Sequence, residues 1–250
     1  MNISATIVIY DEDYDTLQNV LGCFSKIRLK KELIVVDNSP DNRLKELVDG
    51  FEDTSYIFSG KNLGFGAGHN LGFKNLKSDS DIYMVINPDI TFDADEITLM
   101  IEWFFKADDI ALLVPKVLNL DGSVQYICRD IPTFKSLFIR KFNFNNIFEK
   151  SIVKDELDRV CFTDVTDIPF CHGCFMLFKT DVYKKLSGFD ERFFLYMEDV
   201  DILIRAKLFG KTAVNPYFKI YHEHRKGSSK SFKLLYFHIV SALKFFWKYR

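Results

Sequence analysis

An acidic residue stands just beyond one of the apolar runs of this sequence, where chemistry is expected. Asn87-Pro88-Asp89 follows the run 81–86, whose length and apolar character are typical of a buried parallel strand. Proline ends the strand because it has no N–H to donate, and Asp89 is left at the carboxyl end, where open α/β sheets bind ligands. A carboxylate there can hold a divalent cation against a diphosphate. The alternative is an aspartate that merely caps a helix starting near Asp93.

Two further segments contain residue types that bind nucleotides. Asp37 ends the apolar run 32–36, and an acid at such a strand end commonly bonds a ribose hydroxyl. A turn-forming aspartate before Pro40 explains the same pattern. The segment 62–70 reads NLGFGAGHN; its glycines would let the backbone approach a ligand closely, and the N–H groups of the following helix suit anions. Its G-x-G-x-G spacing differs from the dinucleotide fingerprint, which argues against NAD.

A group of three acids follows an aromatic run. The segment 188–201 reads GFDERFFLYMEDVD and places Glu198, Asp199 and Asp201 within four residues at an expected helix start. Acids complement the helix dipole there, but capping explains only one or two of them. Three, behind aromatic residues that can line a pocket, predict a general base. His222 and His224 flank Glu223; a lone histidine is usually packed or solvated, but this pair can include a metal ligand.

The wider pattern is that of an α/β sheet. Strand and helix patterns alternate through the first 115 residues, which predicts βαβ units and a parallel sheet. Right-handed crossovers then bring the carboxyl ends of the strands, with Asp37 and Asp89, to one edge. After Val114 the pattern changes, and Asp121-Gly122 predicts a hairpin. The expected strands are 6–10, 32–36, 56–58, 81–86, 169–178 and 217–222, and the expected helices are 17–24, 42–51, 67–76, 198–209 and 232–248.

Composition limits the possible classes. With 48% hydrophobic residues, 27% charged residues and a net charge of -2, the 250-residue chain is globular and has no nucleic-acid signature. Five irregularly spaced cysteines favour reduced thiols and a cytosolic location. Cys171 and Cys174 have metal-like spacing, but no second pair accompanies them, which favours packed thiols. We expect no signal peptide, and no apolar stretch reaches the roughly 18 residues that span a bilayer.

Taken in order, six segments carry a family resemblance: VDNSP, NLGFGAGHN, INPD, HGCFMLF, GFDERFFLYMEDVDILIR and YHEH. They resemble an inverting family 2 glycosyltransferase of the GT-A fold, and most closely the rhamnosyltransferase-like branch that builds bacterial O-antigens and other surface polysaccharides. The resemblance extends from the first strand to about Tyr249. It implies an α/β fold with a mostly parallel, Rossmann-like nucleotide-binding sheet, a smaller antiparallel element on the acceptor side and a C-terminal amphipathic helix. We expect one domain, 1–250, with a nucleotide-sugar-binding half (1–115), an acceptor and catalytic half (116–224) and a basic segment (225–250).

The resemblance also implies roles for single residues. Asp199 would be the catalytic base with Glu198 beside it, and Asp89 and His222 would bind Mg²⁺ or Mn²⁺ at the diphosphate. The residues expected to contact the nucleotide are Ile9, Tyr10, Asp37, Asn38, Asn62, Gly64, Gly66, Asn70 and Asn87, and those expected on the acceptor side are His172, Gly173 and Asp201. Two departures from the family pattern are Asp11, where an asparagine is usual, and Cys171-His172 before Gly173. The second bears on acceptor preference more than on the chemistry.

These residues predict a metal-dependent glycosyltransferase that moves a sugar from a nucleotide diphosphate donor to an acceptor hydroxyl with inversion. The resemblance implies dTDP-rhamnose as the donor, with UDP-hexoses left open, and bacterial polysaccharide biosynthesis as the context. The alternatives are a nucleotidyltransferase or a non-catalytic nucleotide-binding module. The acids at 198–201, and an acidic rather than phosphate-gripping basic segment after Tyr10, favour the glycosyltransferase.

The C-terminal segment is basic, in contrast to the acidic remainder of the chain. Residues 225–250 contain seven Lys and Arg and no acid, which leaves about -9 on the rest of the chain. Aromatic and aliphatic residues mixed with lysine are typical of an interfacial helix. With a glycan or polyprenyl-linked acceptor, as the resemblance implies, we expect a cytoplasmic protein that binds peripherally to an anionic membrane. The segment 134–148 has a similar composition and would add a second contact. The alternative is a terminal helix that simply packs on its own domain.

Overall fold

The computed structural model describes residues 1–133, 163–223 and 232–250. The predicted membrane contact at 134–148, and His224, lie outside the described residues. The described elements are β1 (Asn2–Ile9), α1 (Tyr14–Ser25), β2 (Lys30–Asp37), α2 (Lys45–Asp49), β3 (Thr54–Phe58), α3 (Phe65–Lys74), β4 (Ile82–Ile86), β5 (Ile90–Thr91), α4 (Ala94–Lys106), β6 (Ile110–Leu118), β7 (Cys128–Arg129), β8 (Thr166–Asp167), β9 (Phe170–Cys171), β10 (Phe175–Lys179), α7 (Thr180–Leu186), α8 (Glu198–Ala206), β11 (Lys211–His222) and α9 (Phe232–Lys248).

A mixed sheet forms the centre of the fold. Within the described ranges it has nine strands in the order β3-β2-β1-β4-β10-β6-β11-β5, with β8 paired to β11. Strands β3, β2, β1 and β4 are parallel, as the alternating strand and helix patterns predicted. β10 is antiparallel to both β4 and β6, and β11 is parallel to β6. The predicted smaller antiparallel element is present as β7 with β9 and as β5 and β8 against β11.

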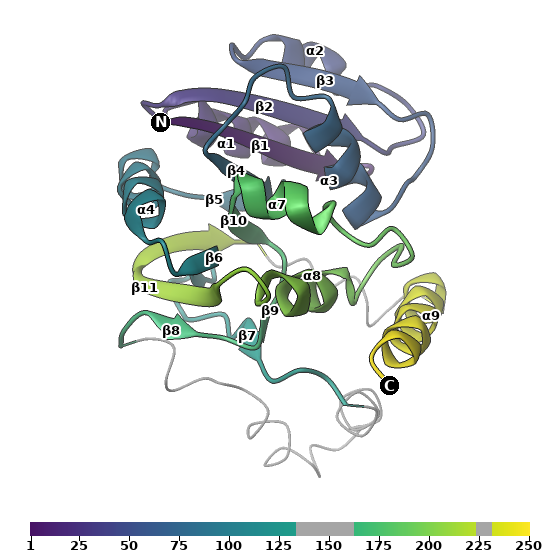
Figure 1. Cartoon of the computed structure of the whole chain (residues 1–250). Helices are drawn as coiled ribbons and strands as arrows, with labels where there is room; N and C mark the ends of the chain where they lie inside the picture. The colour runs from purple at the N-terminus through teal and green to yellow at the C-terminus, as the bar shows by residue number, and fades with distance from the viewer. Residues whose placement is uncertain (134–162, 224–231) are drawn as a thin grey trace.

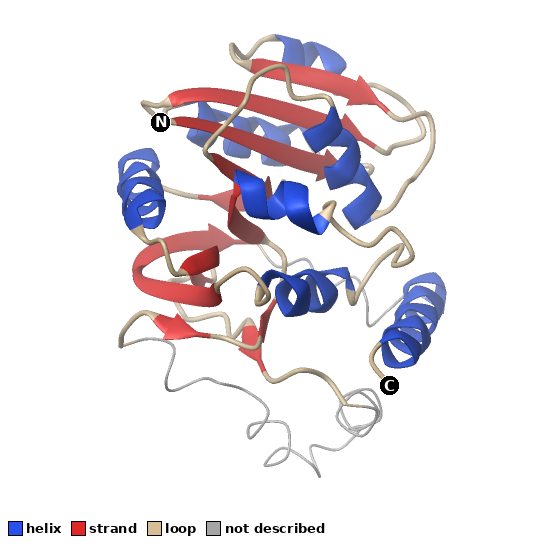
Figure 2. Ribbon diagram, in the orientation of Figure 1, coloured by secondary structure: helices blue, strands red, loops and turns tan. Residues whose placement is uncertain are grey.

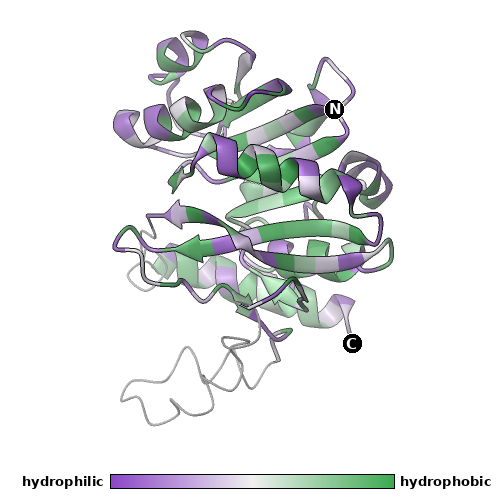
Figure 3. Cartoon of the chain, turned by 90° about the vertical axis from the view of Figure 1, so that its left-hand side faces the viewer, coloured by the Kyte–Doolittle hydropathy of each residue, from purple (hydrophilic) through white to green (hydrophobic). Residues whose placement is uncertain are grey.

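Helices cover both faces of the sheet. In Figure 1, α3 and α7 lie in front of the sheet, and α1 lies behind it; Figure 2 shows these layers by element type. A sheet covered on both faces needs strands that are apolar on both faces. Every residue of β4 is buried, and Figure 3 shows the central strands as mainly hydrophobic. This explains why continuous apolar runs, rather than alternating ones, marked these strands in the sequence.

Several expected boundaries were wrong, each for a local reason. The run 169–178 is not one strand: β9 and β10 are separated by a turn at 172–174, and β9 pairs with β7 in a separate sheet. The last strand starts at Lys211 rather than Tyr217, because a bulge between Asn215 and Lys219 accommodates Pro216 within it. The expected hairpin at Asp121-Gly122 has only a single bridge, between Leu118 and Val124.

Two of the expected helices also differ from the structure in length. The helix expected over 42–51 is confined to Lys45–Asp49. Helix α8 ends at Ala206, although the pattern suggested a helix as far as Phe209. In contrast, α9 matches the expected range 232–248. None of the helices in the described parts of the chain is both long and apolar enough to cross a membrane.

Candidate active site

The two predicted metal ligands lie together at the carboxyl end of β4. Asp89 follows β4, and the next residue, Ile90, pairs with His222 at the end of β11. Nε2 of His222 is 3.4 Å from Oδ1 of Asp89, and both side chains are largely buried. Asp89 does not cap α4, because that cap is Asp93, whose carboxylate accepts the N–H of Glu96 at 2.8 Å. The structural alternative proposed for Asp89 is therefore wrong.

Gln125 orients the His222 ring and fixes which of its nitrogens carries a proton. Its Nε2 donates to the carbonyl oxygen of His222 at 2.7 Å, and this bond orients the amide so that Oε1 faces Nδ1 of the same histidine at 2.9 Å. An amide oxygen only accepts hydrogen bonds, so Nδ1 carries a proton. With Nδ1 engaged in this way, Nε2 is the ring nitrogen that faces Asp89 and can bind a metal ion. Metal-binding histidines are commonly oriented by such a bond from their other ring nitrogen.

The pair of Asp89 and His222 fits a divalent cation. Oδ1 of Asp89 is buried and accepts no hydrogen bond from the described residues, and a buried carboxylate oxygen without a partner is costly. An ion bound here would satisfy this oxygen, with Nε2 of His222 close enough to be a second ligand. Among the described residues no group of three or more potential ligands comes together. An ion held here would therefore take its other ligands from bound phosphate and water, as Mg²⁺ commonly does.

The predicted base lies at the same edge of the sheet. Because β10 is antiparallel to β4, the turn that precedes β10 meets the carboxyl end of β4, and the N–H of Asn87 donates to the carbonyl of Cys174 at 2.9 Å. A Cβ added to Gly173, in this turn, would lie 3.3 Å from Cβ of Asp199. The turn thus connects the end of β4 with the start of α8. Asn87, Gly173 and Asp199 therefore lie close together in the structure.

Asp199 is the reachable carboxylate of this group. Its Oδ2 lies 3.6 Å from Nδ1 of His172, and its side chain is 17% exposed beside a half-exposed histidine. Its Oδ1 accepts the N–H of Val200 at 2.9 Å. The predicted acceptor-side residue His172 therefore lies beside the predicted base.

Glu198 differs from Asp199 in its environment. The residue is 5% exposed, and its Oε2 is buried without a hydrogen bond from the described residues. Burial, and then the neighbouring charge of Asp199, raise the pKa of Glu198. A raised pKa favours the protonated form of Glu198, which makes it the weaker candidate for the base. Of these two adjacent carboxyl groups, Asp199 is the one available to accept a proton.

The cysteines near this edge are packed thiols, as the sequence indicated. Cys171 and Cys174 are both free and buried. Burial, followed by the nearby charge of Asp89, raises the pKa of the Cys174 thiol to about 12. A thiol with this pKa stays protonated and does not act as a nucleophile or a metal ligand.

The ends of β1 and β2 form a second part of the edge. The carbonyl of Ile9 accepts the N–H of Asn38 at 2.9 Å, and Tyr10 beyond it is half exposed. Asn38 donates through Nδ2 to the carbonyl of Gly64 at 3.1 Å. Its Oδ1 is buried without a hydrogen bond from the described residues. Asn38 therefore has an acceptor left for a ligand at this strand end.

Asp37 has the turn geometry that was its structural alternative. Its Oδ1 accepts the N–H of Ser39 at 2.8 Å, which is an Asx turn. Its Oδ2 accepts the hydroxyl of Tyr56 at 2.5 Å, and this bond, together with burial as the larger cause, raises the pKa of Tyr56. The residue is 1% exposed. Its contact with a nucleotide stays a prediction.

The glycine-rich segment packs closely against other parts of the protein, and its contact with a nucleotide stays a prediction. A Cβ on Gly64 would lie 2.1 Å from the carbonyl oxygen of Phe194, and one on Gly66 would lie 2.8 Å from Cβ of Phe189. Gly64 also has a φ of 86°, and its N–H donates to Oδ1 of the exposed Asn62 at 2.9 Å. The space beside these glycines is filled by protein. They let α3 pack closely on the segment that leads to α8.

Two predicted site residues are engaged elsewhere. Asn70 was expected to contact the nucleotide, but its amide donates to the carbonyl of Phe189 and to Glu191, and its Oδ1 accepts from Phe189 and Tyr183. It connects α3 to the 188–191 segment and has no group left for a ligand. Asp201 was expected on the acceptor side, but its side chain has no exposed surface and pairs with Arg205 and Lys248. Their positions do not support the predicted roles.

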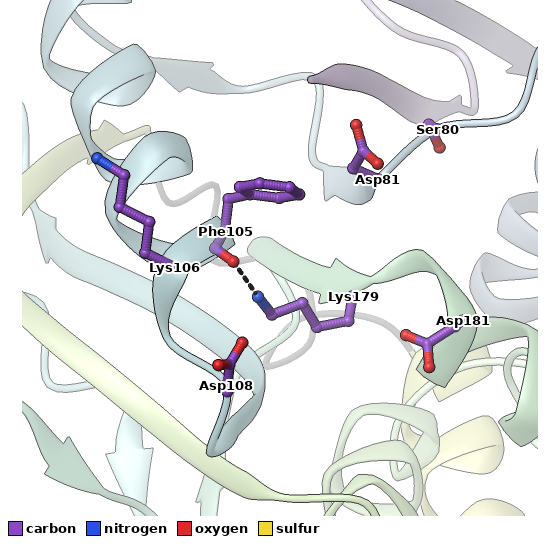
Figure 4. A pocket seen from close by; sticks show the side chains of 7 residues that line it. All are labelled: Ser80, Asp81, Phe105, Lys106, Asp108, Lys179 and Asp181. Atoms are coloured by element: carbon purple, nitrogen blue, oxygen red, sulfur yellow. Dashed lines mark hydrogen bonds between the residues drawn. The ribbon is translucent and has the colours of Figure 1, made fainter.

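An open cleft lies at the opposite edge of the sheet. It has a volume of ≈ 660 Å³ and is lined by residues from the amino end of β4, from the end of β10 and from α4 (Figure 4). Lys179, at its centre, donates to the carbonyls of Phe104 and Phe105 at 2.7 and 2.8 Å and so caps α4. The five residues of β4, at about 3.3 Å each, separate this cleft from Asp89. It takes no part in the site described above.

Gln125 is the site residue that the sequence did not indicate. It lies outside the strands, and its partner His222 is 97 residues away. The sequence offered one signal for Gln125. It follows the Asp121-Gly122 turn, and this turn folds the chain back along β6. The N–H of Gln125 donates to the carbonyl of Val117, in β6, at 2.9 Å.

A mixed α/β sheet with carboxylates and a histidine at the carboxyl ends of its central strands is the architecture of a GT-A glycosyltransferase. The chain belongs to glycosyl transferase family 2, which it matches over residues 4–187. It is 26% identical over 231 residues to the rhamnosyltransferase WbbL of Escherichia coli K12, covering 86% of this chain and 81% of that one. It is 23% identical over 184 residues to an N-acetylglucosaminyl-diphospho-decaprenol L-rhamnosyltransferase of Mycobacterium tuberculosis, covering 68% of this chain and 59% of that one.

Solved structures share the fold. The mannosyltransferase of Pyrobaculum calidifontis, in complex with GDP-Man and Mn²⁺, superposes with a TM-score of 0.59 at 13% identity, over 90% of this chain and 58% of that one. Residues 1–349 of TarS from S. aureus, in complex with UDP, give a TM-score of 0.59 at 15% identity, over 97% of this chain and 66% of that one. The chain thus spans about three fifths of several of these proteins. It is a family 2 glycosyltransferase, homologous to rhamnosyltransferases.

Proposed function

We propose that the protein transfers a sugar from a nucleotide diphosphate donor to an acceptor hydroxyl with inversion and with the help of a divalent metal ion. The observation that carries the proposal is the pairing of two unlike sites at one sheet edge. Asp89 and His222 face each other at 3.4 Å, and Asp199 lies across the 172–174 turn beside Glu198, whose pKa is raised. The Asp89 and His222 pair suits the metal-bound diphosphate of the donor, and Asp199 suits the hydroxyl of the acceptor.

In this mechanism Asp199 accepts the proton of the acceptor hydroxyl while that oxygen forms its bond to the sugar. A hydroxyl is a poor nucleophile, and a carboxylate within hydrogen-bond reach makes it a better one. The bond to the diphosphate breaks on the opposite face of the sugar, which inverts the anomeric carbon. Asp89 and His222 would hold Mg²⁺ or Mn²⁺, which, when bound, supplies positive charge to the leaving diphosphate. Glu198, in its protonated form, adds no charge that would compete for the proton.

The donor base would lie at the ends of β1 and β2. The unpaired Oδ1 of Asn38 is an acceptor suited to the ring N–H of uracil or thymine, and buried acceptors normally have a partner. Both bases carry that N–H, so this contact is compatible with dTDP-rhamnose and with UDP-hexoses. The rhamnosyltransferase relatives favour dTDP-rhamnose as the first donor to test.

We further propose a lipid-linked acceptor that is met at the inner face of the membrane. The name of the mycobacterial relative describes such an acceptor, a diphospho-decaprenol glycan. In α9, large apolar residues at spacings of three and four are exposed: Phe232, Tyr236, Ile239, Leu243 and Trp247. This stripe, in a segment with seven basic residues and no acid, fits the surface of an anionic membrane.

Flotation with vesicles tests the membrane proposal. Vesicles that contain anionic lipid should carry the protein at low salt and release it at high salt, because charge attraction is screened. Replacing Ile239 and Leu243 by serine should weaken the binding, and replacing the exposed Leu99 by serine on α4 should leave it unchanged. No flotation of the parent protein at low salt would contradict the proposal.

A panel of nucleotide sugars tests the transfer reaction. The protein is incubated with dTDP-rhamnose or UDP-hexoses and with Mg²⁺ or Mn²⁺. The slow hydrolysis of the donor is followed by the appearance of the free nucleoside diphosphate. The Asp199→Asn variant serves as the control for contaminating activity. Release of pyrophosphate instead, from a sugar phosphate and a nucleoside triphosphate, would identify a nucleotidyltransferase and overturn the proposal.

A further inference from the structure

The segment that leads to the candidate base has an unusual backbone. Tyr196 and Met197, just before α8, have φ values of 69° and 68°. Two successive residues with side chains in the left-handed region are uncommon, and each costs about 1–3 kcal/mol unless the surroundings hold it. Asp199 follows two residues later. The orientation of the base therefore depends on what holds this segment.

Helix α9 supplies much of that support. Ser241 donates to the carbonyl of Leu195 at 2.8 Å, and Lys244 donates to the carbonyl of Arg192 at 2.7 Å. The ring of His238 stacks on Tyr196 with centroids 4.8 Å apart. Two carbonyls and one of the two strained residues are thus fixed by side chains from a single helix, which Figure 1 shows beside α8.

Lys248 adds a charged attachment at the end of α9. Its Nζ lies 2.8 Å from Oδ2 of Asp190 and also bonds Oδ1 of Asp201. Asp190 stands before the strained pair and Asp201 stands after it, so one ammonium group connects both ends of the segment. Arg192, and then Lys248, lower the pKa of Asp190, and the side chain of Asp201 is fully buried. Both acids form salt bridges with Lys248.

The attachment continues into the body of the fold. Oδ2 of Asp201 accepts from Nε of Arg205 at 2.7 Å. The two remaining nitrogens of that guanidinium donate to the carbonyls of Leu186 and Gly188 at 2.8 and 2.9 Å. Below this network, Phe245 packs with Phe193, Met197 and Val200 in an apolar cluster. Asp201 thus connects α9 with the turn that follows α7.

We propose that α9 positions the catalytic base, and that Lys248 is a positioning residue that acts through Asp190 and Asp201. The ammonium group clamps the segment 190–201 at both ends, Ser241 and His238 hold its middle, and Asp199 takes its orientation from that clamp. This inference rests on the proposed role of Asp199. It gives α9 a task within the active site that is separate from its exposed apolar face.

Lys248→Met tests the clamp with two readouts. Hydrogen exchange should become faster at the amides of 194–201, while protection in β1 and β4 stays at the parent level. With the donor that the panel identifies, kcat should fall by about 10- to 100-fold, the loss expected when a base is displaced by a fraction of an ångström to an ångström. The KM of the donor and the binding of UDP or dTDP with Mn²⁺ should not change.

The controls separate positioning from a loss of charge or of folding. Lys248→Arg, which keeps the charge, should restore most of the activity. Lys184→Met removes a lysine from an exposed pair with Asp79 and should change neither readout. Where Lys248→Met does not fold, Ser241→Ala, which keeps every charge, is judged by the same readouts.

The inference is overturned if the rate of amide hydrogen exchange at 194–201 is unchanged in both Lys248→Met and Ser241→Ala. It is also overturned if the exchange rate rises as much in β1 and β4 as at 194–201. Where the parent protein turns over no donor, the proposed function fails. The exchange measurement then still decides whether α9 holds the segment.

Discussion

Replacing Gln125 by leucine should weaken metal binding without removing a metal ligand. Gln125 makes two hydrogen bonds to one residue, from Nε2 to the carbonyl of His222 and from Oε1 to Nδ1 of its ring. Leucine has a similar size and can make neither. The ring of His222 would then be free to turn or to exchange its proton between Nδ1 and Nε2, so that Nε2 no longer points steadily towards Asp89.

The size of the effect follows from the burial of the pair. His222 is 8% exposed, so water does not readily replace the lost partner, and an unsatisfied buried group costs about 1–3 kcal/mol. Loss of an outer partner of a metal-binding histidine typically lowers metal affinity by about 10- to 100-fold. We therefore expect the Kd of Mn²⁺ in the presence of UDP or dTDP to rise by about 10- to 100-fold, which corresponds to about 1.4–2.7 kcal/mol of binding free energy.

Calorimetric titration of Mn²⁺ measures this directly, at saturating nucleoside diphosphate. Gln18→Leu is the matched control, because Gln18 is the other glutamine of the chain and is exposed on α1. Nucleotide binding without metal should be the same in all three proteins. If Gln125→Leu bound Mn²⁺ as tightly as the control, the ring orientation would not depend on Gln125, and the reasoning about the His222 tautomer would be refuted.

Three other predictions concern single residues. Asp199→Asn should lower transfer by about 10²–10⁴ with little change in donor affinity, since an amide keeps the shape but takes no proton; near-normal turnover would exclude Asp199 as the base. Asp89→Ala should weaken the binding of Mn²⁺ and of UDP or dTDP together, which calorimetry with and without metal measures, and equal metal-independent binding in both proteins would remove the assignment. Burial lowers the pKa of His69 to about 3, so the unfolded chain binds this proton more readily and stability is lost as pH falls from about 6.5. That loss is about 2 kcal/mol at pH 5, so His69→Phe should reduce the difference in Tm between pH 7 and pH 5, and an unchanged difference would contradict the assignment.

The sequence predicted the elements whose character is set locally. The apolar runs before Asp37 and Asn87 are strands because helices cover both of their faces, and strands buried in that way are apolar throughout. The convergence of Asp89 with the carboxyl ends of β1 and β2 follows from parallel pairing alone. These features need no knowledge of which distant side chains meet.

The rest depends on distant contacts that leave no local pattern. The glycines at 64 and 66 match a ligand-binding loop as well as a close-packed helix start, and only the positions of Phe189 and Phe194 show the close packing. Asn70 is conspicuous in the motif, but its four hydrogen bonds go to residues more than 110 positions away. Asp201 shares a cluster with Asp199, but it lies two residues further along α8, about 200° around the helix, where it pairs with Lys248.

The reversal of one strand assembles the site. If β10 ran parallel to β4, the turn at 172–174 would lie at the amino edge of the sheet, near the cleft around Lys179. Because β10 is antiparallel, Phe175 pairs with Ile86, and the turn meets Asn87 on one side and Asp199 on the other. The same reversal puts Lys179 at the far edge, where it caps α4. The distance between the proposed metal ligands and the proposed base is thus set by a three-residue turn, so an insertion at Gly173 should separate the two sites while leaving each one intact.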